Sequence, residues 1–75
     1  MKSQKRVRFE KIASKRVERI LNTLASLSNC SNKNNYEYSM EDIEKMFKIL
    51  KEKLKETELS FQTKLNKSKP NVFKF

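Results

Sequence analysis

Seven basic residues in the first half of the chain have the types and spacing that could bind phosphate groups. Arginine offers a planar fork of N–H donors that fits phosphate oxygens, and several cations acting together release counterions from a nucleic acid. The pattern therefore predicts contact with DNA or RNA through the first part of the chain. The candidate contacts are Arg6, Arg8, Lys11, Lys15, Arg16, Arg19 and Lys33.

The charge of the chain is concentrated in its first part. Residues 1–29 carry eight Lys and Arg against two acids, a net charge of +6, whereas residues 36–60 carry five lysines against seven acids, a net charge of −2. The whole chain has a net charge of +9. A basic segment of this kind can also face an acidic protein surface, or it can be a solvated helix face. These two alternatives to nucleic-acid binding stay open.

The composition supplies little for catalysis. The chain has no histidine and no glycine, so a glycine-rich phosphate loop or a GxSxG nucleophile elbow is excluded. Cys30 is the single cysteine and has no internal disulfide partner, which favours a reducing, cytoplasmic location. No run of 18 apolar residues predicts a membrane span. The sequence predicts a binding protein rather than an enzyme, with no cofactor, no metal and no small-molecule substrate.

A helix is predicted over residues 8–28, after a basic N-terminal tail at residues 1–7. Its apolar residues recur at steps of three and four, the period of an amphipathic helix. They are Phe9, Ile12, Ala13, Val17, Ile20, Leu21, Leu24 and Leu27. Arg8, Lys11, Lys15 and Arg19 follow the same spacing on the opposite side, so one helix face should carry all four. We call these four residues the basic row.

A second helix is predicted over residues 40–66. Ser39 and Asp42 have the spacing of a capping box, in which each side chain bonds the other residue's backbone N–H. The apolar stripe that follows is Ile43, Met46, Phe47, Leu50, Leu54, Phe61 and Leu65, with Thr57 filling a gap. The acids of this helix are spaced to pair with lysines one turn away. The predicted pairs are Glu41–Lys45, Glu44–Lys48 and Glu52–Lys55.

An asparagine-rich connection separates the two helices, and a short tail follows the second. Asparagine favours turns and tolerates the left-handed conformation at a helix end, so it can replace the absent glycine there. Tyr36 and Tyr38 could stack on bases or close the end of a helical core. Pro70 should end the second helix, leaving a mobile tail at residues 67–75 that includes Phe73 and Phe75.

These elements predict an all-α fold, an antiparallel two-helix hairpin that forms one domain over residues 1–75. Two helices cover only part of each other's apolar stripe, so self-association into a homo-oligomer or a larger partner should complete the core. The predicted interface residues are Phe9, Val17, Leu24, Phe47, Leu54, Phe61, Phe73 and Phe75. Docking on a larger protein or ribonucleoprotein machine is the alternative function. Membrane-surface binding fits less well, because the hairpin already uses the apolar stripes.

The segment from Arg8 to Gln62 resembles a group of small, mostly uncharacterised proteins encoded on bacterial phages, plasmids and other mobile elements. The resemblance rests on Arg8-Phe9-Glu10-Lys11, on Leu27-Ser28-Asn29 and on the run from Ser31 to Tyr38, whose most specific part is Asn35-Tyr36-Glu37-Tyr38 before an acidic capping turn. It also includes Arg16-Val17 and Ile20-Leu21. The resemblance implies a two-helix architecture and carries over no site residues.

Overall fold

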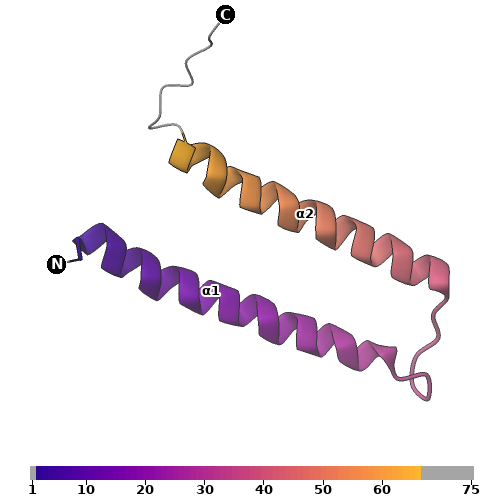
Figure 1. The fold of residues 1–75 in the computed structure, drawn as a ribbon. Helices are drawn as coiled ribbons and strands as arrows, with labels where there is room; N and C mark the ends of the chain where they lie inside the picture. The colour runs from indigo at the N-terminus through magenta and orange to yellow at the C-terminus, as the bar shows by residue number, and fades with distance from the viewer. Residues whose placement is uncertain (1, 67–75) are drawn as a thin grey trace, which may run out of the picture. The chain divides into compact units, whose positions relative to one another are not determined.

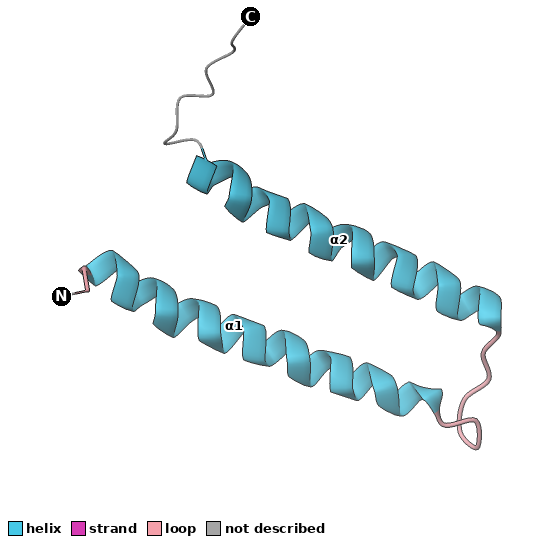
Figure 2. Ribbon diagram, viewed as in Figure 1, coloured by secondary structure: helices cyan, strands magenta, loops and turns pink. Residues whose placement is uncertain are grey.

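The computed structural model describes residues 2–66 of the chain, which form two α-helices and one short 3₁₀ turn (Figures 1 and 2). Helix α1 spans Gln4–Ser28, the 3₁₀ turn η1 spans Asn29–Ser31, and helix α2 spans Met40–Asn66. The predicted all-α, two-helix fold is confirmed. The connection belongs with α1 in one unit that ends at Tyr38, and α2 forms a second unit that begins at Ser39.

Helix α1 begins at Gln4, four residues before the predicted start, because Ser3 caps it. The Ser3 Oγ accepts a hydrogen bond from the Arg6 backbone N–H at 3.1 Å, which satisfies one of the unpaired donors of the first turn. No apolar residue of the stripe precedes Phe9, so the hydrophobic period alone could not reveal these turns. The cap brings Arg6, which was predicted to lie in the tail, onto the helix.

The end of α1 differs from the prediction. Asn29 has right-handed helical angles, and no residue of the described chain has a positive φ, so the predicted left-handed asparagine is wrong. The helix tightens into η1 instead, a common way to satisfy the last carbonyls. Asn32 then organises the turn: its side-chain oxygen accepts from the Asn34 N–H at 3.0 Å, and its carbonyl accepts from the Tyr36 N–H, also at 3.0 Å.

Helix α2 starts with the predicted capping box. The Asp42 N–H donates to the Ser39 Oγ at 3.2 Å, and the Ser39 N–H donates to the Asp42 Oδ2 at 2.8 Å. The hydrogen bond that the Asp42 carboxyl accepts from the Ser39 backbone N–H, and after it a hydrogen bond with the Ser39 side chain, hold the pKa of this carboxyl below its ordinary value of 3.8. The cap is fully exposed, so its contribution comes from hydrogen bonding rather than burial.

The surface ion pairs of α2 agree only in part with those predicted. Glu41 and Lys45 approach to 3.8 Å, as predicted, and Lys53 pairs with Glu56 at 3.3 Å. The other two predicted pairs do not reach ion-pair distance in the described structure. Exposed pairs of this kind contribute little stability each. They nevertheless place opposite charges side by side along α2.

No side chain within residues 2–66 is buried. Ala13, Leu27 and Ile43 are half-buried, whereas most of the apolar stripe on both helices is exposed, up to 76% for Leu65. Helices that bury no apolar face gain little of the hydrophobic stabilisation that normally holds short helices together. The exposed stripes therefore indicate that the chain has a partner. Neither described helix combines the length and the apolar character needed to cross a membrane.

Candidate nucleic-acid interface

The basic row lies on one side of α1, as its spacing requires. Successive members are three or four residues apart, so each lies about one turn beyond the last, and the row from Arg8 to Arg19 is about 16 Å long. All four side chains are exposed. No carboxylate in the described part of the chain lies within ion-pair distance of any of them. The row is a strip of positive charge that forms no ion pair with a carboxylate of residues 2–66.

Arg6 and Lys2 are arranged differently, because both contact Glu10. The Lys2 Nζ lies 2.9 and 3.1 Å from the two Glu10 oxygens, and the Arg6 Nε lies 3.3 Å from one of them. The Arg6 guanidinium also lies 5.5 Å from the centre of the Phe9 ring, within cation–π distance. Glu10 therefore offsets the cations at the start of α1. Sequence reasoning assigned Arg6 to phosphate and did not anticipate this pairing.

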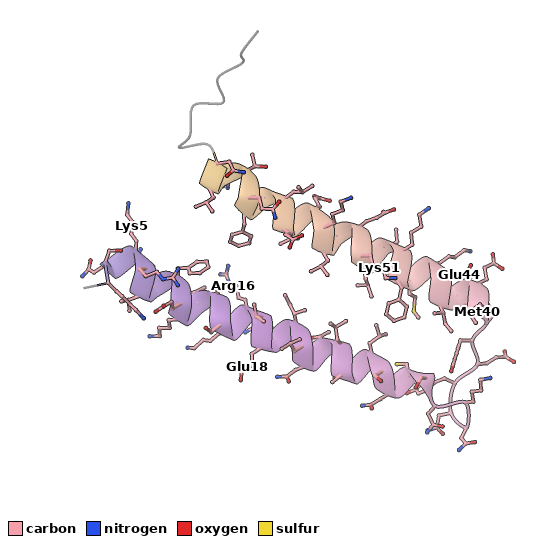
Figure 3. The ribbon with its side chains drawn as sticks, in the orientation of Figure 1. Lys5, Arg16, Glu18, Met40, Glu44 and Lys51 are labelled. Atoms are coloured by element: carbon pink, nitrogen blue, oxygen red, sulfur yellow. The ribbon has the colours of Figure 1, made fainter. Side chains whose placement is uncertain are left out.

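Arg16 lies apart from the basic row, although it follows Lys15 directly. One residue turns an α-helix by about 100°, so Arg16 falls beside Ile12 and Ile20, its neighbours one turn away on the apolar face. Figure 3 shows Arg16 and Glu18 projecting from opposite sides of α1. Arg16 is thus placed at the border of the apolar stripe rather than within the row.

The second half of the basic row borders a shallow, open hollow on α1. Its lining side chains are Lys15, Glu18, Arg19, Asn22, Thr23 and Ser26. The Thr23 hydroxyl is already used, because it donates to the Arg19 carbonyl at 2.8 Å. Lys15, Arg19 and Asn22 are exposed and carry N–H donors, and Glu18 adds one carboxylate to the same lining. The hollow is too open to enclose a small molecule and suits contact with an extended anionic surface.

Lys33 lies in the connection and contacts an aromatic ring. Its Nζ is 5.9 Å from the centre of the Tyr38 ring, and the Tyr38 hydroxyl donates to the Ser31 carbonyl at 2.9 Å. Tyr38 is half-buried and held in the turn, whereas Tyr36 is 51% exposed. Of the two tyrosines considered for base stacking, Tyr36 has the more accessible ring.

The predicted interface residues of the two helices are all exposed. On α1 they are Phe9, Val17 and Leu24, and on α2 they are Phe47, Leu54 and Phe61. Phe73 and Phe75 lie outside the described residues. Sequence reasoning did not include two exposed apolar side chains of α2, Ile49 and Leu59, because both lie off the helical stripe.

Comparisons with other proteins add no family to these observations. No protein-family model, no curated protein and no solved structure matches the chain. Within residues 2–66, no group of three or more Cys, Asp or Glu side chains is placed to hold a metal ion. The resemblance to small proteins of mobile elements therefore remains a prediction, and the interpretation of the site depends on its own geometry and charge.

Proposed function

We propose that this protein binds nucleic acid through the basic row of α1. The observation that supports the proposal is the contrast within the chain: the row has four exposed cations that no described carboxylate neutralises, whereas α2 interleaves its lysines with acids. A helix face that served only for solubility would be expected to mix its charges as α2 does. Arg16, Lys33 and Arg6 are secondary contacts, because each already lies beside an apolar face, a ring or Glu10.

The dimensions of the basic row fit a phosphate backbone. Over about 16 Å of helix axis, a DNA duplex presents about five phosphates on each strand. Four cations can neutralise most of the phosphates on one strand, and the released counterions drive the association. Contacts to phosphate carry no base information, so the proposed binding is independent of sequence. The exposed Tyr36 ring would favour single-stranded bases where they are available.

A salt titration tests the proposal. Four phosphate contacts predict a slope of about −3.6 for log K against log salt on duplex DNA, so affinity should fall about 150-fold between about 50 and 200 mM salt. Fluorescence anisotropy with labelled duplex DNA, duplex RNA and single-stranded RNA measures this slope. Undetectable binding to all three at low salt, or an affinity that does not change with salt, would overturn the proposal.

A second candidate function is docking on a larger protein through the apolar face of α1. The exposure of Val17, Ile20 and Leu21, each above half, favours it. Arg16 at the border would then lie at the rim of the interface, where arginine is common. Capture of one protein partner from cell extract that survives nuclease and high salt, and that is lost in Ile20→Asp, would favour this function over nucleic-acid binding. A role as a modulator from a mobile element belongs to this candidate.

A further inference from the structure

Five apolar residues of α2, Met40 and four members of its apolar stripe, follow a seven-residue repeat. Met40, Phe47 and Leu54 occupy one heptad position, and Ile43 and Leu50 occupy the other position of the seam. This spacing is that of the a and d positions of a coiled coil. Met40 and Leu54 are 69% and 70% exposed, so the seam is largely uncovered. We propose that a second copy of this chain covers it, with the two α2 helices parallel and in register.

Thr57 continues the seam and is adapted to it. A polar side chain at a d position is costly when its hydroxyl loses its partners. Here the Thr57 hydroxyl donates to the Lys53 carbonyl at 2.7 Å within its own helix. The Thr57 hydroxyl donor is therefore satisfied within the monomer. The Thr57 methyl group would then contact the second helix. The seam thus extends from Met40 to Thr57 without an unsatisfied donor.

The net charges of the two helices indicate that α2, rather than α1, can pair with the same helix of a second copy. Helix α1 has seven cations and two carboxylates, a net charge of +5, so two α1 helices side by side would repel each other. Helix α2 has six lysines and six carboxylates, a net charge of zero. Two α2 helices can approach without net repulsion, and the side chains that flank the seam then decide their alignment.

In the parallel alignment, the flanking charges attract. In a parallel coiled coil, a residue at a g position faces the e-position residue of the partner helix that is five positions later in the sequence. Lys53 therefore faces Glu58 of the second copy, and this contact occurs twice in the dimer. Met46 faces Lys51 by the same rule, and no like charges meet along the flanks; Lys64, at the d position that follows Thr57, faces its own copy near the end of α2. Glu44 and Lys51 in Figure 3 mark the flank to which Glu58 also belongs.

Antiparallel alignments are less favourable. The antiparallel alignment that overlaps the whole of α2 brings like charges together. Lys51 and Lys53 each face their own copy, and Glu44 faces Glu58 of the second copy. Slipping by one heptad relieves this repulsion and places Glu44 opposite Lys51, but it leaves residues 58–66 of each α2 outside the overlap. Only the parallel alignment combines complete overlap with attraction between the flanks.

Disulfide trapping tests the orientation, in the full chain with Cys30→Ser as background. Met40→Cys should form a covalent homodimer under mild oxidation, because the two Met40 positions face each other in the parallel seam. In mixtures with Lys64→Cys or Thr57→Cys chains, the 40–64 and 40–57 cross-links should be absent, since about 36 and about 26 Å along the helix separate these positions. Linkage of position 40 to position 57 or 64, with no 40–40 product, would overturn the parallel alignment.

A charge exchange tests the flanking contact. Lys53→Glu and Glu58→Lys should each weaken dimerisation about fivefold, because both create like-charge pairs, and the double exchange should restore it. Glu56→Gln is the matched control, since it removes only the partner of Lys53 within its own helix, and dimerisation should not change. Sedimentation without nucleic acid measures all four variants. A monomer at every concentration, or single exchanges without effect, would overturn the proposal whatever the outcome of the salt titration.

Discussion

The two helices have similar lengths and amphipathic patterns, yet they use charge in opposite ways. Helix α1 has 25 residues and a net charge of +5, and α2 has 27 residues and a net charge of zero. In α2, the pairs Glu41–Lys45 and Lys53–Glu56 place opposite charges side by side. In α1, Glu10 offsets only the cations at the start. The cations beyond it form no ion pair with a carboxylate of the described residues.

The N-termini of the two helices also differ in how their charges and backbone N–H groups are satisfied. Helix α2 has a reciprocal capping box and acids in its first turn, which the helix dipole favours. Helix α1 has one capping bond from Ser3 and no acid in its first turn, where Lys5 and Arg6 oppose the dipole. The N-terminus of α2 is therefore stabilised by its own capping box and acids, whereas the N-terminus of α1 relies on the ion pairs with Glu10.

The largest expected effect comes from neutralising the basic row. Replacing Arg8, Lys11, Lys15 and Arg19 with Gln should weaken nucleic-acid binding about 100-fold at low salt and flatten the salt slope toward zero. The matched control replaces Lys45, Lys48, Lys51 and Lys55 of α2 with Gln, which lowers the net charge from +9 by the same four units. Anisotropy should show a change below about threefold for the control. Equal losses of affinity in the two variants would mean that binding depends on the total charge of the protein and not on the basic row.

Removing the caps should affect α2 more than α1. Ser39→Ala should cost about 1 kcal/mol, because it breaks a capping box, and Ser3→Ala about half as much, because it removes a single hydrogen bond. Circular dichroism at 222 nm, followed through thermal unfolding, measures both. A larger loss for Ser3→Ala would contradict the view that α2 starts more stably than α1.

Much of this comparison could be predicted from the sequence, because both helices have a strong 3.6-residue period. The α2 cap was predictable from Ser39 and Asp42, whose spacing defines the box. The start of α1 was not, because Ser3 lacks an acid three residues later and precedes the apolar stripe. The pairing of Lys2 and Arg6 with Glu10 depends on side-chain geometry that the charge count does not contain. The position of Arg16 also could not be obtained from the charge count, which groups Arg16 with the basic row. Helix geometry places it beside Ile20 instead.

A smaller effect is expected from releasing the cations that Glu10 holds. Glu10→Gln frees Lys2 and Arg6 and removes a negative charge near the row, so nucleic-acid affinity should rise about threefold and the salt slope should steepen. Glu56→Gln is the matched change in α2, because it frees Lys53 in the same way. Its affinity should equal that of the unmodified protein. A loss of affinity in Glu10→Gln, with helix content unchanged, would show that the ion pairs position Arg6 for binding instead of withholding it.

The smallest effect concerns acid titration of the α2 cap. The pKa of Asp42 is lowered in the folded helix by its hydrogen bonds with Ser39, so the contribution of the cap is complete above the ordinary value of 3.8. It is lost as the pH falls through the lower folded value, since the protonated carboxyl accepts less strongly from the Ser39 N–H. The Ser39 amide proton shift should therefore titrate below pH 3.8, and Asp42→Asn should abolish that titration. A Ser39 amide that titrates at or above the ordinary Asp value would show that the reciprocal bond is open in solution, and with it the advantage of α2 over α1 at the helix start.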